Sequence, residues 1–96
     1  MIYETLTYAV DHNVAVITLN RPTVMNALNS QMRAEITDAV GQAGQAARVV
    51  VLTGSGRAFC SGQDLGAEGN FADIDLERTL KDEYVPMLKA ITECPV

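Results

Sequence analysis

Hydrophobic and polar positions near the N-terminus predict two strands joined by a turn. Residues 2–10 are rich in Tyr, Thr, Val and Ile, and residues 11–13 supply turn formers. Residues 14–19 are again apolar and β-branched, so the pattern is typical of a β-hairpin. The second strand is apolar on both faces, which favours a position inside a sheet. We expect the first strand at an edge.

An amphipathic helix is predicted after Pro22, which removes a backbone donor and ends the strand. Asn29 or Ser30 is a suitable N-cap for this helix. Apolar side chains recur at helical spacing on one face: Leu28, Met32, Ile36, Val40, Ala43 and Ala47. The pattern assigns five polar side chains to the opposite, solvent-facing side: Gln31, Arg33, Glu35, Asp38 and Gln42. This spacing indicates a helix packed on a sheet.

A third strand is predicted over residues 48–53, where Val49 to Leu52 forms a short apolar run. We expect this strand to be buried. The order strand, helix, strand implies a parallel crossover and an α/β fold. A loop with three glycines follows over residues 54–65, and functional residues concentrate in such loops at the ends of parallel strands.

A second amphipathic helix is predicted over residues 75–93, with Pro86 interrupting it and a kink near Val85. Its apolar stripe comprises Leu76, Leu80, Tyr84, Leu88 and Ile91. The pattern places three acidic residues on the solvent face: Glu77, Asp82 and Glu83.

Composition describes a small acidic chain. It has 96 residues, with 7 Lys and Arg against 12 Asp and Glu and a net charge of −5. One domain is the most that this length allows. Scattered cations argue against nucleic-acid binding, and short apolar runs argue against a membrane helix. Because the N-terminus lacks a signal-peptide pattern, we expect a cytoplasmic protein with neither nucleic-acid nor membrane partners.

The two cysteines, Cys60 and Cys94, have no Cys or His at metal-ligand spacing. Neither a disulfide framework nor a metal site is therefore expected, and both residues are predicted to be reduced thiols. Cys60 is expected to be a small buried residue rather than a nucleophile, because no basic partner is visible near it.

The glycine loop does not match the phosphate-binding motifs. Gly56 and Gly62 are separated by five residues and followed by Gln63, where a P-loop has four residues and then Lys. Phe59 stands where a dinucleotide motif has its third glycine. A backbone amide site fits better, because Gly62 leaves room for a ligand near the following N–H. The alternative is an ordinary strand-to-helix turn.

Three segments, in this order, resemble the first part of a crotonase, a member of the enoyl-CoA hydratase/isomerase superfamily. They are residues 20–28, with Asn-Arg-Pro and Asn-Ala-Leu, residues 49–54, and residues 59–65. The resemblance implies an α/β fold in which residues 1–96 form the N-terminal part of a crotonase-type spiral of ββα units. Pro95 and Val96 resemble the entry into a further strand, so we expect the chain to be a truncated one. Gly62 to Leu65 and Leu76 to Leu88 most resemble the ring-epoxide isomerases that act on 1,2-epoxyphenylacetyl-CoA.

The resemblance implies an acyl-CoA isomerase or hydratase of fatty acid or phenylacetate metabolism. In this family backbone N–H groups hold the oxygen of a thioester enolate, and the first donor falls on the N–H of Gln63. Residues that match acyl-CoA contacts are Met25, Ala27, Ser61, Gly62, Gln63, Asp64 and Leu65. The second donor and the catalytic carboxylates come later in relatives. Coenzyme A would arrive with the substrate, without a metal or another cofactor, and the family's trimers and hexamers imply a homo-oligomer.

Several residues have two interpretations at this point. Asp64 can cap a helix or contact the ligand, and Arg57 can meet a CoA phosphate or face water. Tyr84 and Met87 can belong to the core or line an acyl pocket. His12 is expected to be solvated in the hairpin turn. A different class of function is a non-catalytic α/β fragment or interaction module whose sheet edge binds a partner chain.

Overall fold

The computed structural model describes residues 2–62, 78 and 80–96. Three strands form one sheet in the order β1 (Leu6–Asp11), β2 (Val14–Leu19) and β3 (Val49–Gly54). β1 pairs antiparallel with β2, and β2 pairs parallel with β3. The predicted hairpin and parallel crossover are therefore confirmed, with β2 at the centre of the sheet. β1 begins at Leu6, four residues later than the sequence pattern suggests.

The hairpin turn is formed by two residues with positive φ, His12 at 52° and Asn13 at 66°. Two such residues in a row match the twist of the flanking strands. The His12 side chain is 91% exposed, with its Nδ1 2.9 Å from a carboxylate oxygen of Asp11. The prediction of a solvated turn histidine is confirmed.

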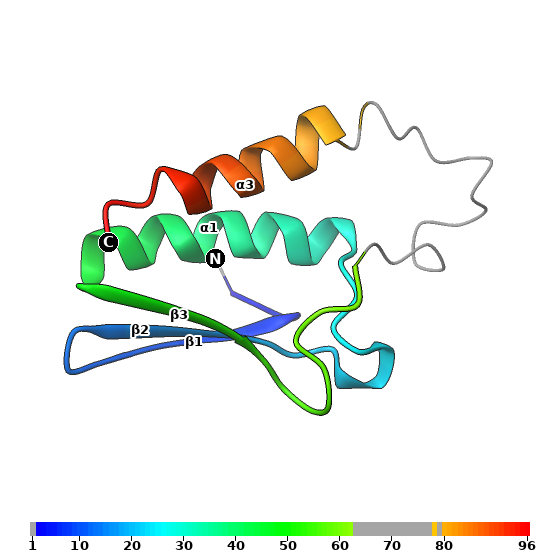
Figure 1. Ribbon diagram of the computed structural model, residues 1–96, viewed down its shortest axis with the longest axis horizontal. Coiled ribbons are helices and arrows are strands. Elements are labelled where there is room, and N and C mark those ends of the chain that lie inside the picture. The colour runs from blue at the N-terminus through cyan, green and yellow to red at the C-terminus, as the bar shows by residue number, and fades with distance from the viewer. Residues whose placement is uncertain (1, 63–77, 79) are drawn as a thin grey trace.

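Helix α1 (Ser30–Ala46) lies over one face of the sheet (Figure 1). Asn29 caps it, because its side-chain oxygen accepts a 2.8 Å hydrogen bond from the N–H of Met32. The core between helix and sheet contains Ala15, Ile17, Leu19, Met32, Ile36, Ala39, Val40 and Ala43. The predicted apolar face of the helix is therefore confirmed.

Two polar residues of α1 are buried, contrary to the sequence pattern: Arg33 is 1% exposed and Glu35 is 3% exposed. One carboxylate oxygen of Glu35 accepts hydrogen bonds from the N–H groups of Glu4 and Thr5 and from the Thr5 hydroxyl, each at 2.9 Å. The other oxygen accepts from Gln31 at 2.9 Å. Buried charges are tolerated when they are paired or hydrogen-bonded. Gln31 is one turn away, but Glu4 and Thr5 lie far from Glu35 in sequence, so helical periodicity could not reveal them.

Strand β3 was predicted to be buried, but the described elements cover only one of its faces. Val50 and Leu52 pack against the core, whereas Val49 and Val51 are 50% and 41% exposed. Side chains alternate between the two faces of a strand, so the described elements cover one face of β3 and leave the other open. An apolar run predicts a strand without showing how many of its faces are covered.

The second helical segment runs alongside α1 (Figure 1). A π-helical turn, η3 (Leu80–Tyr84), leads directly into α3 (Val85–Thr92), with Pro86 in the first turn of α3. The predicted interruption near Val85 therefore coincides with a change of helix type. The predicted residues 75–77 and 79 lie outside the described part of the chain.

The buried residue of α3 is Met87, which is 5% exposed. Leu80, Leu88 and Ile91 of the predicted stripe are instead 56%, 53% and 39% exposed. A π turn holds more residues than an α turn, so η3 rotates the face that a continuous α-helix would bury. The predicted stripe was therefore wrong at these three positions, whereas Tyr84 packs partly buried against the core.

Across residues 2–62, 78 and 80–96, no helix has the length and apolar character needed to cross a bilayer.

Candidate functional site

Two loops meet beyond the C-terminal ends of the parallel strands β2 and β3. The first loop, residues 20–29, joins β2 to α1, and the second loop, residues 55–62, follows β3. Figure 1 shows them next to one another at the right of the molecule. Ligands of α/β proteins bind outside this end of the strands. Both segments with predicted acyl-CoA contacts reach this place.

Backbone hydrogen bonds fix the two loops against each other. The N–H of Leu28 donates to the carbonyl of Gly62 at 2.6 Å, and the N–H of Ser61 donates to the carbonyl of Met25 at 3.0 Å. The structure thereby brings four predicted contact residues into one cluster, namely Met25, Ala27, Ser61 and Gly62. The other three lie outside the described residues: Gln63, Asp64 and Leu65.

The cluster combines exposed and buried groups. The Met25 residue is 47% exposed, whereas Ala27 is 7% exposed. Met25 has a left-handed φ of 52° because it ends the short helix η1 (Pro22–Val24), where its N–H donates to the Pro22 carbonyl at 3.2 Å. Gly62 has a φ of 105°, which favours glycine. The exposed residues Met25 and Ser61 are therefore the parts of the cluster most open to a ligand, and the half-buried Gly62 turn lies beside them.

Asn26 joins the two loops through its side chain, a role that the sequence analysis missed. It is fully buried, and its Nδ2 donates to the carbonyls of Ser55 at 2.9 Å and Ala58 at 2.8 Å. Its Oδ1 accepts from the N–H of Arg21 at 2.7 Å. The signal in the sequence was weak: Asn tolerates the left-handed φ of 55° found here, but its partners on the second loop are distant in sequence.

Gly54 allows the second loop to fold closely over the end of β3. A Cβ added at this position would lie 2.5 Å from the carbonyl oxygen of Phe59 and 2.8 Å from that of Ala58. It would also lie 2.8 Å from Asn26 Nδ2. Any side chain here would therefore displace the backbone that Asn26 holds. The sequence showed Gly54 only as one of several loop glycines.

An apolar cavity of about 170 Å³ borders the cluster. It is lined by Leu19, Leu28, Ile36, Leu52, Phe59, Cys60, Met87 and Ile91. Met87 is a buried core residue that also lines this cavity, and its role in an acyl pocket stays a prediction. Cys60 is a free thiol and is half-buried rather than fully buried. Arg57 is exposed on the second loop, and its two interpretations stay open.

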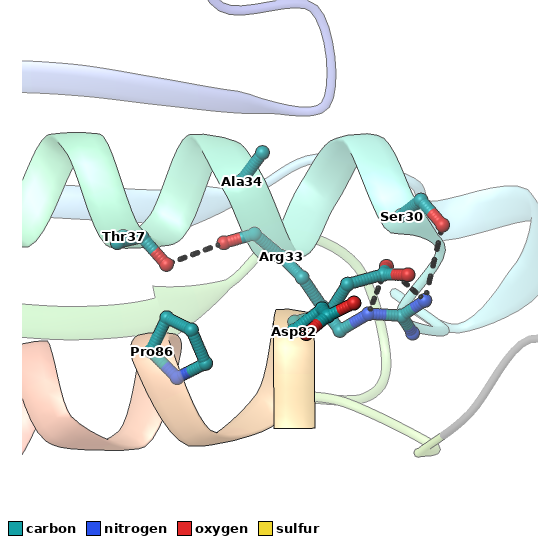
Figure 2. A pocket seen from close by; sticks show the side chains of 7 residues that line it. Ser30, Arg33, Ala34, Thr37, Asp82 and Pro86 are labelled. Carbon is teal, nitrogen blue, oxygen red and sulfur yellow. Dashed lines mark hydrogen bonds and ion pairs between the residues drawn. The ribbon is translucent and has the colours of Figure 1, made fainter. Parts of the chain in front are cut away.

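Glu83 was predicted to face solvent, but most of its side chain is buried. Its side chain is 16% exposed, and its Oε1 accepts hydrogen bonds from Nε and Nη2 of Arg33 at 3.0 and 2.7 Å. Burial acts to raise the pKa of the Glu83 carboxyl, but hydrogen bonds from Arg33 and Ser30 and the Arg33 charge outweigh it and hold the pKa below 4.5. The pair borders a second cavity, of about 260 Å³, between α1 and the start of the second helical segment (Figure 2).

Comparison with known proteins finds relatives of one family. Residues 9–96 match the family described as enoyl-CoA hydratase/isomerase. The whole chain is 55% identical over 96 residues to a probable enoyl-CoA hydratase of Rhodobacter capsulatus and covers 37% of it. Over 91 residues, 90% of the chain, it is 32% identical to the 1,2-epoxyphenylacetyl-CoA isomerase of Escherichia coli and covers 35% of that protein.

The fold also matches a solved structure. The crystal structure of an enoyl-CoA hydratase from Mycobacterium smegmatis superposes with a TM-score of 0.84 and 32% identity. The match covers 97% of this chain and 37% of that one. The chain therefore spans less than two fifths of the length of these relatives.

Proposed function

The chain belongs to the enoyl-CoA hydratase/isomerase family, and from this premise we propose that its two paired loops help to bind an acyl-CoA thioester and to stabilise its enolate through backbone N–H groups. The α/β fold is the N-terminal part of the fold seen in that family, as the sequence resemblance predicted. The relatives and the loop geometry support the proposal together, because the matched motifs are the segments that form the cluster.

The hydrogen bond from the Leu28 N–H to the Gly62 carbonyl is the observation that carries this proposal. A peptide unit is planar, so holding its carbonyl restrains the whole unit. The N–H of that unit belongs to Gln63, the proposed first oxyanion donor. Donors that are already aligned before the reaction stabilise developing charge without reorganisation, and losing one typically costs about 2.7 to 4 kcal/mol.

The proposed chemistry places negative charge on the thioester oxygen. This charge develops when water adds to the β-carbon of an enoyl-CoA or when a proton leaves the α-carbon. N–H donors that bind this oxygen more tightly in the transition state than in the ground state raise kcat. No acid among the 96 residues is proposed as the general base, and the second donor is likewise not assigned to this chain.

The remaining cluster residues are proposed to contact the CoA part and the acyl group of the substrate. Met25 offers an exposed apolar side chain beside the second loop, and Ala27 and Ser61 lie next to it. Because the chain has a net charge of −5, attraction of an anionic CoA has to come from local amides and individual cations rather than from the overall field.

Hydration of an enoyl-CoA is the preferred reaction, and ring-epoxide isomerisation is the second candidate. A relative named as a hydratase is 55% identical, against 32% for the one named as an epoxide isomerase.

Isothermal titration with crotonyl-CoA tests the proposal. We expect saturable binding by the full-length protein, with free CoA binding more weakly because it lacks the thioester. Binding by the full-length protein and none by the 96-residue chain would show that these residues supply only part of the site. The absence of binding by either would overturn the proposal and favour a non-catalytic interaction module. Comparing turnover of crotonyl-CoA and 1,2-epoxyphenylacetyl-CoA then separates the two candidate reactions.

A further inference from the structure

Arg33 is buried between α1 and η3, where it binds the second helical segment. Its side chain is 1% exposed, and besides its two hydrogen bonds to Glu83 it donates from Nη1 to the Tyr84 hydroxyl at 3.2 Å. The guanidinium carbon lies 4.7 Å from the centre of the Tyr84 ring. Figure 2 shows Arg33 extending from α1 to the side of Asp82 in η3. Arg33 therefore fixes η3 against α1 through the Glu83 carboxylate, the Tyr84 hydroxyl and the Tyr84 ring.

The same guanidinium also binds the first loop and the start of α1. Nη1 donates to the carbonyl of Leu28 and Nη2 donates to the hydroxyl of Ser30, each at 3.2 Å. The N–H of Leu28 donates in turn to the Gly62 carbonyl at 2.6 Å. Leu28 thus lies between Arg33 and Gly62, and two hydrogen bonds lead from the guanidinium to the turn that carries the proposed function.

We propose that Arg33 is a positioning residue for the proposed acyl-CoA site: it holds Leu28, and through Leu28 it aligns the Gly62 peptide unit relative to η3. This inference rests on the proposed function. Arg suits the role because its planar guanidinium presents five donors in a fixed arrangement. Here these donors reach three chain segments at once, whereas a methionine or leucine of similar size would fill the space without orienting any carbonyl.

A purely structural role for Arg33 gives different expectations. A buried ion pair is costly to desolvate, and replacing both partners with apolar residues is often neutral or stabilising. If Arg33 only fills the core, its effect on turnover should follow protein stability. If Arg33 positions Leu28, turnover should fall even where stability is restored, because the Leu28 carbonyl still lacks its donor.

The test compares three variants of the full-length protein in crotonyl-CoA turnover and thermal unfolding. Arg33→Met should lower kcat at least about tenfold and change KM less than about threefold, because misalignment affects the transition state more than ground-state binding. The double variant Arg33→Met/Glu83→Leu should regain thermal stability without regaining kcat. Ala39→Gly, at a fully buried position of α1 away from this cluster, should lower stability and leave kcat unchanged.

Recovery of kcat in the double variant, or wild-type kcat in Arg33→Met, would overturn the positioning role. Amide hydrogen exchange at Leu28 distinguishes this failure from failure of the proposed function. Exchange should be at least about tenfold faster in both Arg33 variants than in Ala39→Gly, because only the former loosen the bond to Gly62. Faster exchange in a protein that neither binds nor converts acyl-CoA would overturn the proposed function and support the structural link. Unchanged exchange would overturn the link itself.

Discussion

The backbone N–H of Leu28 and the carbonyl oxygen of Gly62 lie 2.6 Å apart, and this hydrogen bond joins the end of the first loop to the end of the second. The parallel strands β2 and β3 deliver the two loops to the same place, and the bond then sets their relative position. The proposed site is therefore a property of the pair of loops rather than of the glycine turn alone. Substitutions that separate the loops should affect stability and acyl-CoA binding together.

Asn26→Ala should be strongly destabilising. The substitution removes three side-chain hydrogen bonds, leaves the carbonyls of Ser55 and Ala58 without this donor, and places Ala at a φ of 55°. Each lost bond at a buried group contributes about 1 kcal/mol or more, so we expect a loss of about 2 to 4 kcal/mol in the free energy of unfolding. Urea denaturation of the wild type and the variant measures this loss.

Asn20→Ala is the matched control for Asn26→Ala. Asn20 is exposed on the same loop, and its side-chain oxygen accepts one 3.1 Å bond from the Ser55 hydroxyl. Its replacement should change the free energy of unfolding by no more than about 0.5 kcal/mol. Equal effects of the two substitutions would contradict the linking role of Asn26.

Gly54→Ala and Gly41→Ala should change stability in opposite directions. The added methyl group at position 54 meets the carbonyl oxygens of Phe59 and Ala58 at 2.5 and 2.8 Å, so the second loop has to move. Overpacking of this kind costs typically about 1 to 3 kcal/mol. At Gly41, in the exposed interior of α1, the described residues beyond the adjacent helix backbone place no heavy atom within 4 Å of the new Cβ, and helix propensity favours Ala by up to about 1 kcal/mol.

Thermal unfolding of the two glycine variants gives the comparison directly. The melting temperature of Gly54→Ala should fall and that of Gly41→Ala should rise. A melting temperature for Gly54→Ala equal to that of the wild type would show that the loop does not need its close approach to β3.

Glu35 should make stability depend on pH in the acid range. Burial acts to raise the pKa of its carboxyl, but hydrogen bonds from Thr5, Gln31 and the Glu4 N–H outweigh this effect and hold the pKa below 4.5. A carboxyl whose pKa is lowered in the folded state contributes stability above its unfolded pKa. That contribution is lost as pH falls through the folded value. Stability should therefore decrease as the pH drops below about 4.5.

Glu35→Gln should flatten this dependence, because the amide keeps an acceptor for the N-terminal residues and does not titrate. The measurement is the urea midpoint at a series of pH values from neutral to acidic. If the variant and the wild type lose stability equally over the acid range, the Glu35 carboxylate is not a source of the effect.

Much of the architecture followed from local pattern. The hairpin, the N-cap at Asn29 and the parallel strand after α1 were predictable because turn formers, capping residues and apolar periodicity act over short stretches. The motif resemblance also brought Met25, Ala27, Ser61 and Gly62 into one expected site, and the structure places these four together. Gln63, the predicted donor, lies outside the described residues, so its role stays a prediction.

The errors share a physical cause, which is dependence on partners far away in sequence. Periodicity assigned Arg33 and Glu35 to solvent because it treats every polar side chain of a helix as outward-facing. Their partners, Glu83 and Thr5, become neighbours only after folding. The prediction of which face of the second helical segment is buried was wrong in part for a related reason. The π turn that places Met87 in the core has no strong sequence signal.

The central claim is that the Gly62 turn presents a backbone donor to a thioester, and the kcat/KM of Gly62→Val for crotonyl-CoA tests it most directly. The φ of 105° at Gly62 is strained for valine, although among the described residues no atom within 4 Å blocks a Cβ, so the turn should change while the fold is kept. We predict a fall of about 100- to 1,000-fold, with circular dichroism unchanged and Gly41→Val active as the matched control. A kcat/KM near that of the wild type would contradict the account.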